Sequence, residues 1–465
     1  MLQPKMGLLP LYLELYDKVM PEIRTRMEEF RDRISLEFTR RGLAVTVAPV
    51  CRVESEFMAA MGLFEDASVD AIVTLHLAYS PSLEAVSVLA NTRLPLIVLD
   101  TTPSFSFSPG DEPTELMYNH GIHGVQDLCN RLIRAGKTFH IEAGHWQKSD
   151  VLDRVVGWVK AAAASTNLSR ARVGLIGSQF KGMGDFAVPF EVLKSTLGVE
   201  VVVADFAELV NFMPGADAPE TLDEVRSDQI SFNFNAQDDF LEEHKATSRV
   251  GLAVRRWIEK HELTAFTMNF SDINATTGLP TVPFLEASKA MARGIGYAGE
   301  GDVLTAAFVG VLASLFPETS FTEMFCPDWE HNAIFLSHMG EINPCCVSGK
   351  PVLAKKSLPW INTGDSVMIV GRFKAGLATL VNLAPMPDDD YSLILVPVKV
   401  IGPEDGDGMT DTVRGWITSE VPLADLLAEY SNLGGTHHSA LVYGDALDTL
   451  IRLGMIRGWE TAVIG

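Results

Sequence analysis

The stretch DAIVTLHLAYS, residues 70–80, decides the fold class of the amino-terminal part of the chain. Its run of β-branched and apolar residues is typical of a strand buried on both faces of a sheet. Amphipathic segments with helical spacing, such as 22–42 and 124–136, lie on either side of it. Similar apolar runs occur at 43–50, 94–103 and 137–146. This alternation predicts a parallel sheet covered by helices, and we expect residues 1–170 to form an N-terminal α/β domain.

The same pattern restarts at RVGLIGS, residues 172–178. Further apolar runs at 199–206 and 263–270 predict the strands of a second parallel sheet. We therefore expect a central α/β domain over residues 171–330.

The composition changes again at about residue 331. Closely spaced β-rich runs separated by turn residues, typical of antiparallel strands, occur at 365–373, 377–385 and 391–402. Helical patterns follow at 422–433 and 445–456. We predict a C-terminal β-rich domain over residues 331–465. The predicted fold class is α/β, with two Rossmann-like α/β domains followed by a C-terminal antiparallel β domain.

The composition of the 465 residues, 47% of them hydrophobic, is that of a globular chain of two or three domains. The longest apolar run, residues 303–316, ends at Pro317 and is too short to span a membrane, so it predicts a buried helix. The first residues show no basic region before their apolar part, and we expect no secretory signal. Five cysteines without a pairing pattern predict reduced thiols in a cytoplasmic protein.

The net charge of −23, from 60 acidic and 37 basic residues, argues against several classes of partner. Such a charge repels a phosphate backbone, and no window of the chain gathers a stripe of lysine and arginine. We therefore expect no nucleic-acid partner, and because no apolar run is long enough to span a bilayer we also expect no membrane.

Two glycine-rich segments raise the question of other ligands. IGSQFKGMGDF, residues 176–186, lacks both G-K-[ST] and G-x-G-x-x-G, so we expect no nucleotide there. HGIHG, residues 120–124, indicates either histidines that hydrogen-bond a polar ligand or a separate metal site.

Segments far apart in the sequence offer side chains that bind metals. Glu300 lies in a glycine-rich turn that opens a helix, Glu323 follows the end of that helix, and His338 ends an apolar strand. The stretch GGTHHS adds His437 and His438. Two carboxylates with two imidazoles suit Mn²⁺, Co²⁺ or Fe²⁺ better than Ca²⁺ or an ion that prefers thiolates.

Each of these side chains also has a structural explanation. Glu300 could be a carboxylate favoured by the dipole at a helix N-terminus, and His338 could be a hydrogen-bonded histidine of the core. Because no two of them share a short motif, spacing alone leaves both explanations open.

Seven segments together carry a family resemblance. Three lie in the amino-terminal part: LHLAYSPS (75–82), NHGIHGVQDL (119–128) and GHWQ (144–147). Four surround the metal-binding residue types: GYAGEGDVLTAA (296–307), TSFTEMF (319–325), LSHMGEINP (336–344) and GGTHHS (434–439). In this order they resemble the L-arabinose isomerase family, within the broader arabinose/fucose isomerase group. The resemblance covers most of the chain and implies two α/β domains followed by a β domain.

The resemblance implies a metal site. Its ligands are Glu300, Glu323, His338 and His438, and its ion is Mn²⁺, with Co²⁺ or Mg²⁺ as other possibilities. Because neighbouring side chains cannot both face one point, His437 is left to face the substrate or a neighbour.

The resemblance also implies a sugar pocket and an assembly. The residues that match the pocket positions are His123, Phe180, Phe270, Phe325, Met339 and His437. The partners implied are a small-molecule sugar and further copies of the chain, in a homo-oligomer (hexamer or tetramer) with active sites near subunit interfaces.

The implied reaction is isomerisation of an aldose and a ketose, a pentose or a (deoxy)hexose, through an enediol(ate). Glu300 and Glu323 would share the catalytic transfer of a proton between C2 and C1. Two alternatives stay open: epimerisation of a sugar or sugar acid at the same metal site, and sugar binding without catalysis on the isomerase fold.

The sequence departs from the family at three places. LLPLYLELYDK (8–18) stands where the family has a Gln-His-Leu-Tyr-Gly run, Phe325 replaces a tyrosine, and the sequence stops at GWETAVIG, before the family's usual end. A sugar hydroxyl left unpaired in a buried site costs about 1–3 kcal/mol. The sugar therefore need not be L-arabinose, and a fucose-like, other deoxy or modified sugar stays open.

Overall fold

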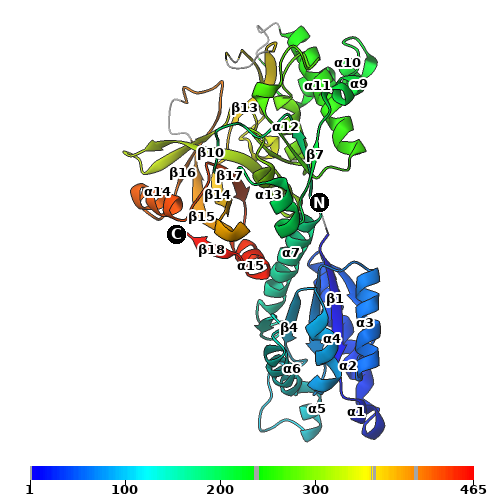
Figure 1. The fold of residues 1–465 in the computed structure, drawn as a ribbon. Coiled ribbons are helices and arrows are strands. Elements are labelled where there is room, and N and C mark those ends of the chain that lie inside the picture. The colour runs from blue at the N-terminus through cyan, green and yellow to red at the C-terminus, as the bar shows by residue number, and fades with distance from the viewer. Residues whose placement is uncertain (1–2, 235–239, 358, 360–362, 403–406) are drawn as a thin grey trace. The chain divides into compact units, whose positions relative to one another are not determined.

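The computed structural model describes residues 3–234, 240–357, 359, 363–402 and 407–465. The chain divides into two compact units, Leu2–Thr166 and Asn167–Gly465. Each is described by itself, and both are drawn in Figure 1.

The unit Leu2–Thr166 is built on a five-stranded, wholly parallel sheet of order β2-β1-β3-β4-β5. The strands are β1 Lys5–Leu11, β2 Ala44–Val47, β3 Ala71–His76, β4 Leu96–Asp100 and β5 His140–Ala143. The helices are α1 Glu14–Val19, α2 Ile23–Arg40, α3 Glu54–Asp66, α4 Ser82–Asn91, α5 Leu116–Asn119, α6 Ile122–Arg134 and the start of α7 Val151–Ser169. The predicted parallel sheet is confirmed.

β1 is the strand of this sheet that the sequence did not predict. It is paired on both sides and buried from its second residue onward. Its run KMGLLPL contains Gly7 and Pro10, and both residue types are depleted in strands. The apolar pattern alone therefore did not predict a strand there.

The unit Asn167–Gly465 begins with a four-stranded parallel sheet of order β7-β6-β8-β9. Its strands are β6 Arg172–Ile176, β7 Glu200–Val203, β8 Ala265–Met268 and β9 Gly296–Ala298. The helices of this part are α8 Phe190–Val192, α9 Phe206–Phe212, α10 Pro219–Ser231, α11 Leu241–Lys260, α12 Phe284–Ala292 and α13 Val303–Leu315. The second predicted parallel sheet is thus confirmed.

Two helices pack closely against this sheet. Trp257 of α11 lies over Gly174 of β6, where an added Cβ would come within 2.3 Å of the indole. α13 is buried along most of its length, as the sequence predicted for its apolar run. Among the described residues, no helix is both long and apolar enough to cross a membrane.

A nine-stranded mixed sheet completes the unit, in the order β12-β13-β16-β11-β10-β17-β14-β15-β18. Its strands are β10 Thr319–Asp328, β11 Ala333–Ser337, β12 Val352–Lys356, β13 Ser366–Arg372, β14 Gly376–Pro385, β15 Tyr391–Ile401, β16 Val413–Thr418, β17 His438–Tyr443 and β18 Glu460–Val463. Most pairs are antiparallel, as predicted, while β13–β16 and β15–β18 are parallel.

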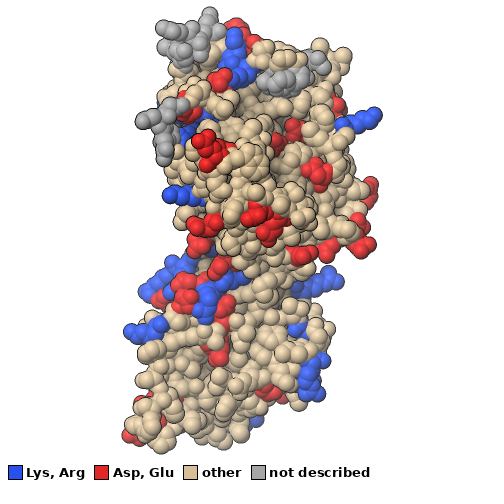
Figure 2. All heavy atoms as spheres, turned by 90° about the vertical axis from the view of Figure 1, so that its left-hand side faces the viewer, with Lys and Arg blue, Asp and Glu red and all other residues tan. Residues whose placement is uncertain are grey.

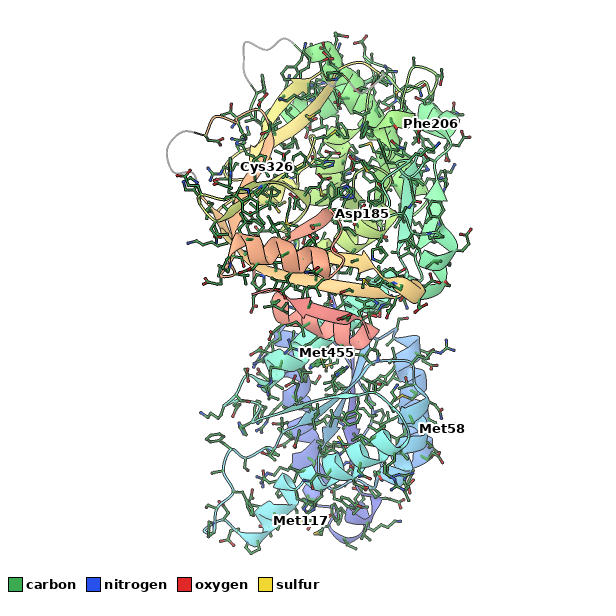
Figure 3. All side chains as sticks on the ribbon, turned by 60° about the vertical axis from the view of Figure 1, so that its left-hand side comes forward. Met58, Met117, Asp185, Phe206, Cys326 and Met455 are labelled. Atoms are coloured by element: carbon green, nitrogen blue, oxygen red, sulfur yellow. The ribbon has the colours of Figure 1, made fainter. Side chains whose placement is uncertain are left out.

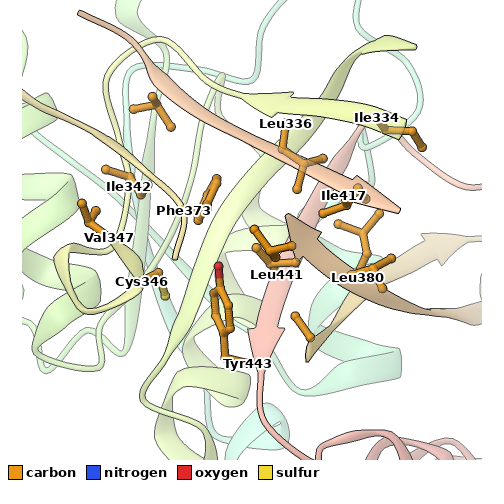
Figure 4. Close-up of a cluster of buried hydrophobic side chains, with 14 of the residues drawn as sticks. Ile334, Leu336, Ile342, Cys346, Val347, Phe373, Leu380, Ile417, Leu441 and Tyr443 are labelled. Carbon is orange, nitrogen blue, oxygen red and sulfur yellow. The ribbon is translucent and has the colours of Figure 1, made fainter. Parts of the chain in front are cut away.

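The sheet also closes on itself. β16 pairs with β15 as well as with β11, so β16, β11, β10, β17, β14 and β15 form a ring of six strands. A cluster of buried apolar side chains packs on these strands, and Figure 4 shows Leu336, Leu380, Ile417 and Leu441 within it. Two helices flank β17, α14 Leu423–Asn432 and α15 Leu447–Arg457, where the sequence predicted them.

Glu323 differs from its predicted place. The sequence assigns it to the central α/β domain, whereas it lies on β10, a strand of the nine-stranded sheet. The reason is that Thr319–Glu323 pair residue by residue with His438–Val442, so the chain enters the sheet directly after α13. The boundaries at residues 170 and 330 stay a prediction.

Charged side chains are spread over the surface. On the face drawn in Figure 2, acidic and basic groups are intermingled, and no continuous basic stripe crosses the residues shown there.

Candidate metal centre

Strand register brings two of the candidate ligands together. β10 pairs with β17 so that Glu323 lies opposite His438, the first residue of β17. On its other side Glu323 pairs with Ser337, and His338 follows directly as β11 ends. Three ligand-type side chains from distant parts of the sequence therefore meet at one place on the sheet.

Glu300 reaches the same place from a turn. It follows β9 and has a left-handed backbone, with φ of 55°. Asp302 caps α13 by accepting a hydrogen bond from the backbone N–H of Thr305 at 2.9 Å. At Gly299 an added Cβ would lie 2.9 Å from the ring of His338, so only glycine lets this imidazole come so close to the turn.

The four side chains form one compact cluster. One nitrogen or oxygen atom from each of Glu300, Glu323, His338 and His438 lies within 4.8 Å of the others. Nε2 of His438 is 2.8 Å from Oε2 of Glu300 and 3.0 Å from Oε1 of Glu323. Nε2 of His338 is 3.4 Å from the same Glu323 oxygen. Glu300 and both histidines are buried.

A second layer of buried carboxylates holds the two imidazoles. Nδ1 of His438 lies 2.9 Å from Oδ2 of Asp302, and Nδ1 of His338 lies 2.7 Å from Oε2 of Glu341. The hydroxyl of Tyr297 donates to the other Glu341 oxygen at 2.6 Å. Because each Nδ1 is occupied, each Nε2 is directed to the shared cluster.

The electrostatics of the cluster favour ionised carboxylates. Burial raises the pKa of Glu300 and Glu323, but the neighbouring imidazoles of His338 and His438 outweigh it and hold both pKa values below their usual range.

The two imidazoles shift in the opposite direction. Burial lowers the pKa of His338 and the charge of Glu341 raises it. For His438, burial is likewise outweighed, first by the hydrogen bond to Asp302. The net result is a raised pKa for each ring.

The donor set fits a divalent cation. Nε2 of His338 is buried and makes no hydrogen bond within the part of the chain that the structure describes, which is costly for a polar atom unless another group binds it. Two carboxylates and two imidazoles are ligands suited to Mn²⁺ and similar ions. Phe321 lies edge-on to both rings, with centroids 4.7 Å from His338 and 5.0 Å from His438, and limits the access of water.

The residues predicted to line a sugar pocket are distributed around this cluster and beyond it. Phe180 donates its backbone N–H to the carbonyl of Glu300 at 2.9 Å, and its ring lies 5.8 Å from that of Phe270. Phe325 is half exposed at the bulge of β10, and Met339 follows His338. These four residues therefore lie at or next to the segments that carry the cluster.

His437 and His123 have different surroundings. His437 precedes His438, and the two ring centroids are 4.3 Å apart. His123 lies in the unit Leu2–Thr166, exposed on α6, where it contributes with Phe105 and Phe107 to a cavity of about 320 Å³. The structure thus brings His437, but not His123, into the unit of the metal cluster.

Sequence reasoning missed the supporting residues. Asp302, Glu341 and Tyr297 were not singled out, although Asp302 follows Glu300 by two residues and Glu341 follows His338 by three. A carboxylate so close to each ligand in the sequence was the available signal. Asp185 and Phe186 contact His437 and His438. No signal in the sequence pointed to these contacts, because the partners lie some 250 residues apart in the chain.

Comparisons with known proteins agree with one another. Residues 193–316 match the L-arabinose isomerase central domain, and residues 318–460 match the L-arabinose isomerase C-terminal domain. Together these ranges cover more than half of the chain.

Similar relatives extend the match. An L-arabinose isomerase of Shouchella clausii is 25% identical over 98% of this chain and 93% of its own length. One of Herpetosiphon aurantiacus is 26% identical over 82% of this chain and 78% of its own. Among solved structures, a periplasmic sugar-binding protein of Legionella pneumophila overlaps with a TM-score of only 0.15 at 10% identity, covering 67% of this chain and 92% of its own.

Proposed function

The chain belongs to the L-arabinose isomerase family, and on that premise we propose that it interconverts an aldose and a ketose with the help of a divalent metal. The observation that carries the proposal is the convergence of Glu300, Glu323, His338 and His438 in one buried cluster. A protein that only binds sugar has no need of two carboxylates at such a point.

In this proposal the four residues hold Mn²⁺, for which Co²⁺ or Mg²⁺ can substitute. When bound, the ion supplies Lewis acidity, which stabilises negative charge on two adjacent sugar oxygens. Asp302 and Glu341 fix the two imidazoles, and the apolar ring of Phe321 keeps water away from them.

Glu300 and Glu323 carry the proton chemistry. Isomerisation removes the proton from C2 and delivers one to C1, which converts an aldehyde with its neighbouring hydroxyl into a ketone through an enediol(ate). Both carboxylates have lowered pKa values, so they are ionised near neutral pH and able to accept the C2 proton. One oxygen of each carboxylate lies within 3.0 Å of His438 Nε2, which supports a reaction in which the two carboxylates share the work at C2 and C1.

The substrate is a pentose or a (deoxy)hexose. Phe180, Phe270 and Phe325 lie at or next to the segments that carry the cluster, and their rings have no hydroxyl. In this proposal that favours a sugar with an apolar end, such as a deoxy sugar, over a fully hydroxylated one. We also propose a homo-oligomer, a hexamer or a tetramer, with active sites near subunit interfaces.

The test is isomerase activity on a panel of aldoses and ketoses. Metal-stripped protein is compared with protein to which Mn²⁺ has been restored, and Glu300→Gln and Glu323→Gln run alongside. We expect Mn²⁺-dependent ketose formation that both substitutions abolish. Mn²⁺ binding through these residues without turnover of any sugar would contradict the isomerase function and leave the metal site standing.

A further inference from the structure

The glycine-rich segment 176–186, which the sequence does not assign to phosphate binding, lies against the metal cluster. The segment begins at the last residue of β6. The backbone N–H of Phe180 donates a hydrogen bond to the carbonyl of Glu300. Farther along, Asp185 reaches the start of β17, and Figure 3 labels it in this unit. Phe186 stacks on the ring of His438, with centroids 4.9 Å apart and planes at 7°. The segment therefore contacts the cluster through Phe180 and Phe186, and it contacts the neighbouring His437 through Asp185.

One oxygen of Asp185 holds His437 at two points. The backbone N–H of His437 donates to Oδ2 at 2.9 Å, and its ring Nδ1 lies 2.6 Å from the same oxygen. Bonding the backbone and the ring of one residue to a single acceptor fixes the ring relative to its own main chain. The ring is thus held although the side chains of His437 and Asp185 are 40% and 37% exposed.

The opposite nitrogen of this ring is free. Among the described residues no hydrogen bond occupies Nε2 of His437, although the ring centroid is only 4.3 Å from that of the ligand His438. Because His438 directs its Nε2 to Glu300 and Glu323, the neighbouring ring of His437 lies beside the cluster. A fixed ring with one free nitrogen is suited to a hydrogen bond with a hydroxyl.

We propose that Asp185 is a positioning residue for the sugar: it fixes His437 so that Nε2 binds a sugar hydroxyl next to the metal-binding residues. The inference rests on the proposed function for the identity of the ligand. Asp185 itself contacts neither the cluster nor the sugar. Its effect passes through His437, because an unrestrained ring would lose rotational freedom each time a sugar binds.

The test combines kinetics with metal binding, on the full chain loaded with Mn²⁺. For Asp185→Ala we expect KM for the best sugar of the panel to rise about tenfold, as for one lost hydrogen bond of about 1.4 kcal/mol, with a smaller change in kcat. The Mn²⁺ affinity, measured by equilibrium dialysis, should stay within twofold. Asp185→Asn keeps an acceptor oxygen, so its KM should lie between those of Asp185→Ala and the parent protein.

A matched control comes from the same unit. Asp328 holds Nδ1 of His331 at 2.9 Å in a pair whose carboxylate is about as exposed as that of Asp185 and whose imidazole is more exposed. Asp328→Ala should leave KM unchanged. If Asp185→Ala behaves as Asp328→Ala does, the pair Asp185–His437 is only a surface ion pair and the proposal fails.

A spectroscopic measurement separates this inference from the proposed function. In ¹⁵N–¹H spectra of the histidine rings, with the His437 signal identified by His437→Gln, the Nδ1 proton should appear at the low field of a charge-assisted bond. Asp185→Ala should abolish this signal whether or not a sugar is turned over. If the Nδ1 proton signal is absent in the parent protein, the positioning role is overturned. If the signal is present but no sugar is turned over, the result counts against the isomerase function alone.

Discussion

Asp302 and Glu341 each hold one imidazole of the candidate metal centre by its Nδ1. Both carboxylates are fully buried, and each makes a further bond, Asp302 to the N-terminus of α13 and Glu341 to Tyr297. Such carboxylate–histidine pairs set the ring orientation and increase the basicity of the nitrogen that faces the metal. The two candidate ligands are therefore held in place by α13, through Asp302, and by Tyr297, through Glu341.

For Asp302→Asn we expect the Mn²⁺ affinity to fall about 10- to 100-fold, because the amide no longer offers His438 a charged acceptor. Equilibrium dialysis measures the change. Asp205→Asn is the matched control, since Asp205 also caps a helix, α9, by accepting from Ala207. An affinity that changes equally in both variants would show that helix capping, rather than the support of His438, is responsible.

The Mn²⁺ affinity should also depend on pH. The pKa values of His338 and His438 are raised in the metal-free protein, so both rings tend to carry a proton that competes with the metal. We expect affinity to increase as pH rises and to be lost as pH falls, with protons released on binding. Titration calorimetry in buffers of different ionisation enthalpy counts these protons, and a pH-independent affinity without proton release would contradict the model.

At the residue scale, the sequence predicted the ligand types but not their arrangement. Glu300, Glu323, His338 and His438 were proposed as ligands through a family resemblance, because their separations carry no short motif. The contacts of Asp185 could not be foreseen at all, since a bond across 252 positions depends on how the sheets are placed.

At the scale of elements, α10, α11 and α12 are joined by buried and partly buried charged side chains. Glu224 of α10 bonds to Arg255 of α11 at 2.6 Å and to Lys289 of α12, and Asp228 of α10 bonds to the same lysine at 2.5 Å. Arg255 also bonds to Glu286 of α12 at 2.8 Å. These helices are therefore held together by ion pairs as well as by apolar contacts, and removal of one partner leaves a charge uncompensated.

Acid should weaken the ion pairs that join α10 to α11 and α12. Burial raises the pKa of Glu224, but Arg255 and Lys289 outweigh it and lower the pKa from 4.5 to about 2. A carboxyl with a depressed folded-state pKa stabilises the fold above its unfolded pKa, and the contribution disappears as pH falls from 4.5 towards 2. The free energy of unfolding, measured with urea, should fall over this range by at most about 3 kcal/mol from this group. In Glu224→Gln the free energy of unfolding should fall less steeply with decreasing pH. An identical slope in the two proteins would exclude a contribution from the ionised Glu224.

Packing of α11 on β6 gives a second stability prediction. Gly174→Ala should destabilise the protein by about 1–3 kcal/mol, because the added methyl group meets the indole of Trp257. Gly62→Ala is the control: Gly62 lies inside α3 with no atom within 4 Å of an added Cβ, so alanine should be neutral or stabilising there. Urea unfolding measures both, and a loss of equal size in the two variants would contradict the packing argument.

Elements with strong apolar runs were predicted, and those whose identity depends on tertiary pairing were not. β3, β4 and β6 correspond to predicted runs. β9 has only three residues, and nothing in so short a run distinguishes a strand from a turn. The closure of six strands into a ring depends on the pairing of β15 with β16, which no local pattern indicates.

At the scale of the whole molecule, all four ligand-type residues of the cluster belong to the unit Asn167–Gly465. They come from a turn after the parallel sheet and from three points of the nine-stranded sheet. A metal that binds them therefore joins these two sheets, and binding of an ion only by the native state stabilises that state.

We expect Mn²⁺ to raise the unfolding temperature of metal-stripped protein. At an ion concentration 100 times Kd the gain in the free energy of unfolding is about 2.7 kcal/mol. Differential scanning calorimetry with and without Mn²⁺ measures the shift. Glu300→Gln should remove most of it, and a shift of equal size in that variant would place the bound ion elsewhere.

The pairing of β10 with β17 has one more consequence. A strand can shift against its neighbour only by whole residues, and a shift by one residue turns every side chain to the opposite face. Glu323 lies opposite His438 in the native pairing, and the other edge of β10 pairs with β11. Which side chains face each other here is therefore all-or-none: as the protein diverges, residues around the cluster can change while Glu323 and His438 stay opposite each other.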